Sequence, residues 1–104
     1  MKLEDIERDK QADLEEVCRQ RSVARLEIFG SVAKGEDDPD SSDLDFLVEF
    51  KELPFGKRAD AFFGLLEDLE RLFGRKVDLV TISAINNPYF LKNIEPHRKV
   101  LYAA

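Results

Sequence analysis

An amphipathic helix over residues 57–73 is the strongest structural prediction from this sequence, because apolar side chains recur there with helical spacing. The predicted apolar face consists of Ala59, Phe62, Phe63, Leu66, Leu69 and Phe73, and Leu65 and Leu72 widen it. Gly74 follows directly and is typical of a helix C-terminal cap. Strand patterns flank this helix at residues 43–50 and 76–82. The sequence therefore predicts an α/β domain in which the helix covers one face of a sheet.

The rest of the chain continues the alternation of helices and strands. Residues 3–20 predict a helix and residues 25–29 a strand, and residues 99–102 predict a last strand or a packed terminus. A single helical turn at 32–34 and a short helix beginning at Pro88 complete the order αβαβαβα. With 104 residues, the chain is expected to form one two-layer domain over residues 1–104.

Composition narrows the functional classes. The chain has 16 Lys and Arg against 22 Asp and Glu, a net charge of −6. Nucleic acids are bound mainly through Lys and Arg, so we expect no direct nucleic-acid partner, although a local basic patch stays open. One Cys and one His exclude a zinc site of thiolates or imidazoles, so a bound metal would have oxygen ligands. The charged N-terminus and the short apolar runs predict a cytoplasmic protein without a membrane partner.

Two carboxylates mark the start of the strand predicted at 43–50. Alternate residues of a strand point to one face, so Asp43 and Asp45 would lie on the same side, about 7 Å apart along the backbone. Two like charges at that distance repel each other, and a divalent cation held between carboxylate oxygens relieves the repulsion. The alternative is that Ser42 and Asp43 only form the turn that leads into the strand.

Asp78 lies inside the strand predicted at 76–82, where burial of an unpaired carboxylate is costly. If this strand neighbours the strand at 43–50, Asp78 joins Asp43 and Asp45 on one face. Three carboxylates from adjacent strands can hold two metal ions for phosphoryl transfer. The alternatives are that Asp78 pairs with Arg75 or Lys76, or lies on a solvated face.

A turn with the sequence Gly-Ser follows the strand at 25–29. Gly30 permits backbone conformations closed to other residues, and Ser31 opens a helical turn whose free N–H groups can bind an anion. Lys34 adds positive charge, but the Walker A pattern is missing. The alternative is an ordinary tight turn that begins with serine.

The combination of these features resembles the nucleotidyltransferase superfamily of DNA polymerase β, and most of all its minimal nucleotidyltransferases. The similarity runs over about residues 26–102 and consists of Phe29-Gly30-Ser31, Gly35, Ser42-Asp43-Leu44-Asp45 and Val77-Asp78. The spacer between Ser31 and Asp43 is one residue longer than in many minimal members, a difference that the acidic loop at 36–42 should absorb. The resemblance implies the polymerase β-like fold, a mixed sheet covered by helices.

The resemblance also implies a reaction. Asp43, Asp45 and Asp78 would bind two Mg²⁺ ions, with Mn²⁺ as an alternative, and would be the catalytic residues. Gly30 and Ser31 would hold the β- and γ-phosphates of ATP, with Lys34 beside them. In minimal nucleotidyltransferases that act as antitoxins, AMP passes from ATP to a tyrosine of a HEPN-type toxin, and that partner is expected here.

Two other functions stay open from the sequence. The chain could be a binding module that neutralises its partner by contact alone, or a nucleotidyltransferase that modifies a small molecule. The predicted helix at 57–73 has more apolar positions than one sheet contact needs. Some of Phe62, Phe63, Leu65 and Leu72 could therefore face a partner, unless the C-terminal segment covers them. The oligomeric state is left open.

Overall fold

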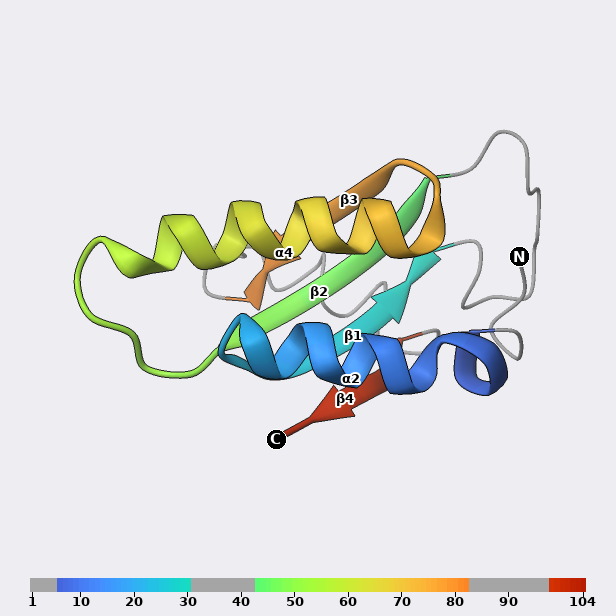
Figure 1. Cartoon of the computed structure of the whole chain (residues 1–104), viewed down its shortest axis with the longest axis horizontal. Coiled ribbons are helices and arrows are strands. Elements are labelled where there is room, and N and C mark those ends of the chain that lie inside the picture. Colours follow the sequence, from blue (N-terminus) through green and yellow to red (C-terminus); the bar gives the residue numbers. More distant parts are fainter. Residues whose placement is uncertain (1–5, 31–42, 83–97) are drawn as a thin grey trace.

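The computed structural model describes residues 6–30, 43–82 and 98–104. It contains a π-helical turn (Ile6–Lys10), α2 (Gln11–Gln20), β1 (Val23–Phe29), β2 (Leu44–Phe50), α4 (Lys57–Phe73), β3 (Val77–Thr81) and β4 (Lys99–Ala103) (Figure 1). The helix predicted at 57–73 is confirmed at both ends. The predicted turn at 32–34, the loop at 36–42 and the helix beginning at Pro88 lie outside the described residues.

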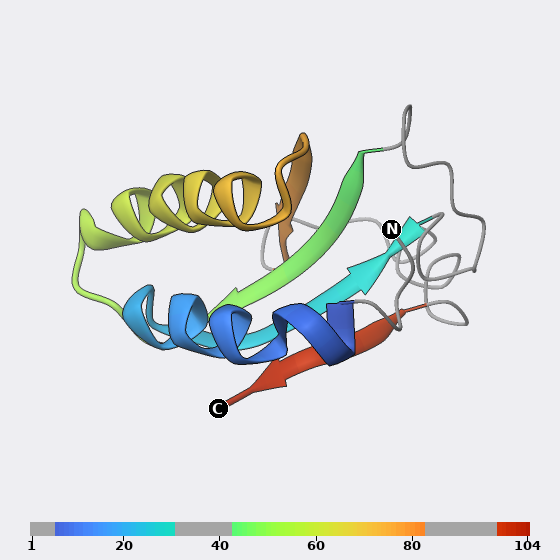
Figure 2. The ribbon, with the colours of Figure 1, turned by 45° about the vertical axis from the view of Figure 1, so that its right-hand side comes forward.

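The four strands form one mixed sheet in the order β3-β2-β1-β4. β1 runs antiparallel to both β2 and β4, whereas β2 and β3 are parallel. A parallel pair needs a crossover connection, and α4 provides it between β2 and β3. Helices α2 and α4 lie side by side on the same face of the sheet (Figures 1 and 2). The prediction of a two-layer mixed α/β fold is confirmed.

The hydrophobic core lies between the two helices and the sheet. Strand residues alternate in direction, and the core takes every second residue of β2 and β3, among them Phe46 and Leu79. The ring of Phe46 stacks on that of Phe73 in α4, with ring centroids 5.7 Å apart. Cys18 is fully buried in this core, and burial raises the pKa of its thiol to about 12, so it acts as a small apolar side chain.

The apolar face of α4 is turned from the prediction. Leu65, Leu69 and Phe73 are the buried residues of this helix, whereas Ala59 is exposed and Phe63 is 65% exposed. The first turns of α4 project past the ends of β2 and β3, so their apolar residues have less sheet to pack on (Figure 1). The suggestion that Leu65 could face a partner is wrong, while Phe63 is available to solvent.

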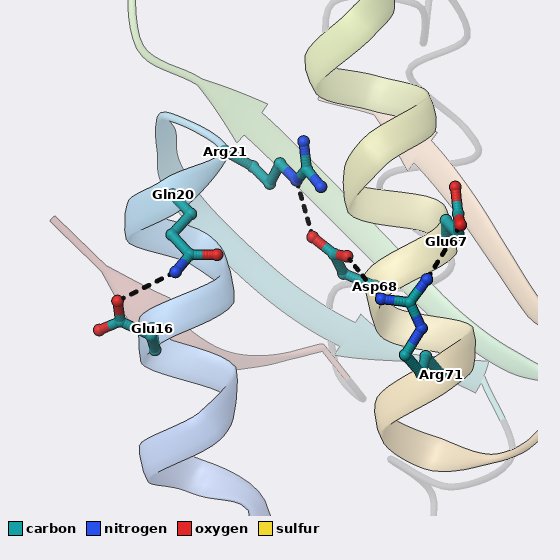
Figure 3. Close-up of polar contacts among 6 residues, drawn as sticks. All are labelled: Glu16, Gln20, Arg21, Glu67, Asp68 and Arg71. Atoms are coloured by element: carbon teal, nitrogen blue, oxygen red, sulfur yellow. Dashed lines mark hydrogen bonds and ion pairs between the residues drawn. The ribbon is translucent and has the colours of Figure 1, made fainter.

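An ion pair joins the end of α2 to α4. The guanidinium of Arg21 donates to the carboxylate of Asp68 over 2.7 Å and lies against Gly64, where a Cβ atom would meet it at 2.5 Å (Figure 3). Within α4, Arg71 approaches the same Asp68 carboxylate at 3.8 Å (Figure 3). None of the helices in the described part of the chain is long and apolar enough to cross a membrane.

Candidate active site

Asp45 and Asp78 lie side by side on the face of the sheet that points away from α2 and α4, here called the second face. They are register partners in the parallel pair of β2 and β3. Their strand neighbours Phe46 and Leu79 point into the core, so the two carboxylates point to the opposite side. Neighbouring strands lie about 4.8 Å apart, which makes Asp45 and Asp78 direct neighbours across the sheet.

Asp43 precedes β2 and is exposed. Its charge acts on Asp45 together with that of Asp78. Burial raises the pKa of the Asp45 carboxyl above its ordinary value, and the negative charges of Asp78 and Asp43 raise it further. Both charges that shift the pKa of Asp45 are thus negative, and the carboxylate trio (Asp43, Asp45 and Asp78) is a concentration of negative charge.

The expectation that Asp78 is buried is wrong. Asp78 is exposed on β3, which is one of the two edge strands of the sheet, and Asp45 on the inner strand β2 is the member of the trio that is partly buried. Of the alternatives left open from the sequence, a solvated face agrees with this exposure.

Gly30 stands at the end of β1, directly beside Asp45. Its φ of 78° lies in the left-handed region, which side chains with a Cβ atom rarely adopt. A Cβ at this position would lie 2.2 Å from Oδ2 of Asp45. Two features therefore require glycine here: the left-handed backbone conformation, and the Asp45 carboxylate that occupies the place of a Cβ atom. Ser31 and Lys34, the other predicted phosphate-binding residues, lie outside the described residues.

The donor chemistry of the trio fits magnesium, which takes carboxylate oxygens as ligands. In the parts of the chain that the structure describes, no three Asp, Glu, His or Cys side chains are yet gathered closely enough to hold a metal ion. Asp43 and Asp78 are exposed, so their carboxylates have room to rotate toward Asp45. After burial, the negative charges of Asp78 and Asp43 are the causes of the raised pKa of Asp45, and a bound cation would offset those charges.

Glu27, to which the sequence pattern assigned no role, is the buried charged side chain of the second face. Its Oε1 accepts a hydrogen bond from Nη2 of Arg25 over 3.0 Å and lies 3.3 Å from Nε of Arg98. The available signal was a glutamate two residues before Phe29, inside a strand that is otherwise largely apolar. The sequence alone could not show that Arg98, which is distant in the chain, lies beside Glu27.

Residues 12–101 match the family model of the nucleotidyltransferase domain. MJ0128 of Methanocaldococcus jannaschii, an inferred protein adenylyltransferase, is 44% identical over 93 residues, which are 89% of this chain and 88% of that protein. Protein adenylyltransferase MntA of Thermococcus cleftensis is 39% identical over 85 residues, which are 82% of each protein.

Solved structures of nucleotidyltransferases resemble this chain as well. An inferred minimal nucleotidyltransferase superposes with a TM-score of 0.73 and 32% identity, covering 96% of this chain and 94% of that one. A chain from the complex of tri-AMPylated Shewanella oneidensis HEPN toxin with MNT antitoxin has a TM-score of 0.63 and 16% identity, covering 94% and 73%. The second likeness is one of fold. The chain therefore belongs to the nucleotidyltransferase family, in its minimal, MntA-like branch, and is a nucleotidyltransferase enzyme.

Proposed function

We propose that this enzyme transfers AMP from ATP to a tyrosine hydroxyl of a HEPN-type toxin and thereby acts as the antitoxin of a toxin–antitoxin pair. The observation that carries the proposal is the register of Asp45 with Asp78, with Asp43 and Gly30 at the same edge of the sheet. The relatives support the choice of acceptor, since several are named protein adenylyltransferases. The acidic net charge suits a basic, RNA-cleaving partner.

The carboxylate trio would bind two Mg²⁺ ions, with Mn²⁺ as an alternative. Bound there, the ions would neutralise the triphosphate and the charge that develops as pyrophosphate leaves. The backbone of Asp45 is part of β2, and its carboxylate occupies the space that a Cβ atom at Gly30 would take. Its position is therefore set by the fold before substrate binds. Such a fixed position matters because phosphoryl transfer depends on alignment and electrostatic stabilisation rather than on a protein nucleophile.

Each remaining residue has a distinct task in this proposal. Gly30 and Ser31 hold the β- and γ-phosphates, and Lys34 adds positive charge beside them. The acceptor hydroxyl attacks the α-phosphorus, the bond to the bridging oxygen breaks, and pyrophosphate departs. Asp78, exposed at the edge of the trio, orients and activates the attacking hydroxyl.

The test is the intact mass of the partner toxin after incubation with the enzyme, ATP and Mg²⁺. The proposal expects the mass to rise by one or more AMP units with the unchanged enzyme and to stay constant with Asp45→Asn. Glu49→Gln is the matched control, because Glu49 is an exposed carboxylate further along the same strand and on the same face. It should leave the mass increase unchanged.

Two results would reject this function. An undiminished mass increase with Asp45→Asn would show that the trio does not carry the reaction. If instead Asp45→Asn fully suppresses toxicity in cells and the unchanged enzyme adds no AMP, the chain neutralises its partner by contact alone.

A further inference from the structure

Glu27 is a buried charged side chain to which the carboxylate trio gives no task. It is 2% exposed, and no other charged residue in the described part of the chain is as deeply buried. Removing a carboxylate from water is costly unless cations pair with it. Arg25 and Arg98 both approach its Oε1, at 3.0 and 3.3 Å. A buried carboxylate that binds two arginines fixes the position of both.

Arg98 lies in the same crosswise row of the sheet as the carboxylates. The antiparallel register of β1 and β4 pairs Ile28 with Lys99, so one further step places Arg98 opposite Phe29. Phe29 is in turn the register partner of Asp45, and Asp45 that of Asp78. Residues directly opposite each other share a face, so Arg98 stands on the second face, two strands from Asp45.

The guanidinium of Arg98 is only partly used. Its Nε faces Glu27, its side chain is 25% exposed, and its two terminal amino groups have no partner within the described residues. A planar fork held at one edge leaves two parallel donors for a phosphate. Because Glu27 already restricts the side chain, less conformational entropy is lost when the fork binds a ligand.

The net charge of the proposed site favours an additional positively charged donor such as Arg98. A triphosphate and three carboxylates together carry more negative charge than two divalent cations neutralise. Arg25 pairs in register with Glu49, whereas Arg98 stands in the row of Asp45 and Asp78, so Arg98 is the arginine placed to supply positive charge to the nucleotide. We infer that Arg98, positioned by Glu27, binds a phosphate oxyanion of the nucleotide. This inference rests on the proposed function, because it takes the carboxylate trio as the nucleotide site.

The test is the binding of ATP, measured by isothermal titration calorimetry on the full chain with Ca²⁺ in place of Mg²⁺ and without acceptor. Arg98→Lys keeps the charge and loses the fork. A charge-assisted pair of hydrogen bonds lost in this way weakens ATP binding about 10- to 100-fold. Arg25→Gln is the matched control: Arg25 binds the same oxygen of Glu27 but pairs in register with Glu49, further along β1 from Asp45. It should leave the affinity within about twofold.

A double-mutant cycle separates positioning from mere support of the fold. Glu27→Gln should weaken ATP binding by a smaller factor, and Glu27→Gln combined with Arg98→Lys should be no worse than Arg98→Lys alone. If Arg98→Lys does not fold, Arg98→Gln with Glu27→Gln removes both charges together and is used for the same measurement, with the same expected loss.

Three outcomes would overturn the inference. They are an unchanged ATP affinity in Arg98→Lys, an equal loss in Arg25→Gln, and losses in Glu27→Gln and Arg98→Lys that add. The measurement needs no turnover, so its failure is distinct from failure of the proposed function, which Asp45→Asn tests by mass.

Discussion

Replacement of Gly30 by alanine tests how the site is built. The new Cβ would lie 2.2 Å from Oδ2 and 3.1 Å from Cγ of Asp45, whereas ordinary contacts begin near 3.4 Å. The Asp45 carboxylate must therefore move by about 1 Å, and a displacement of that size costs roughly 100-fold in rate. The left-handed backbone at Gly30 adds about 1–2 kcal/mol of strain in the free energy of folding.

Gly74→Ala is the control that isolates the backbone contribution. Gly74 has a φ of 65° and no atom within 4 Å of the position that a Cβ would take, so alanine there brings the same strain without a clash. For a domain of this size, about 1–2 kcal/mol lowers the melting temperature by roughly 4–16 °C. We expect Gly74→Ala to show that loss with full transfer activity at a temperature where it is folded.

The assay is a melting curve for each variant, followed by initial rates of AMP transfer well below both melting temperatures. We expect Gly30→Ala to melt no higher than Gly74→Ala and to lose about two orders of magnitude in rate. A folded Gly30→Ala that transfers AMP within a few-fold of the unchanged enzyme would refute this role of Gly30. An equal loss of activity in Gly74→Ala would refute it as well.

Three other side chains of the described structure, Asp45, Phe46 and Asp68, can be tested by substitution. Because burial and like charges raise the pKa of Asp45, that group stabilises the metal-free fold fully below the unfolded carboxyl pKa of about 3.9, and the contribution is lost as pH rises through the raised folded pKa. Metal-free Asp45→Asn should therefore melt higher than the unchanged protein at pH 7, with the difference vanishing near pH 4. Phe46→Ala removes a fully buried ring that stacks on Phe73 and should cost about 3–5 kcal/mol in urea unfolding. Asp68→Ala breaks the pair with Arg21 and should cost about 1–3 kcal/mol, with AMP transfer by the folded protein unchanged.

Local patterns in the sequence were sufficient to predict α4. The helix occupies residues 57–73 as expected, because its periodicity and the glycine cap act within one segment. Its buried face was predicted less well: Leu65 is central and Phe63 exposed, since the sheet beneath the helix decides which part of a broad apolar face is covered. In the described part of the helix predicted at residues 3–20, the first turn, Ile6–Lys10, is π-helical.

Part of the candidate site could likewise be predicted from local sequence patterns, and part could not. The shared side of Asp43 and Asp45 follows from the twofold period of a strand, which the sequence contains. The exposure of Asp78 depends on β3 being an edge strand, which only the assembled sheet reveals. The link between Glu27 and Arg98 joins distant parts of the chain through the pairing of β1 with β4, and no local pattern predicts it.

Metal binding between β2 and β3 is tested most directly by the number of Mn²⁺ ions bound per chain in the presence of a non-hydrolysable ATP analogue, followed by electron paramagnetic resonance. Two bound ions are expected for the unchanged enzyme. Asp45→Asn should lose both, and Asp78→Asn should lose the second. Equal binding by Asp45→Asn and the unchanged enzyme would contradict the proposed site, because the metals would then lie somewhere other than between these two strands.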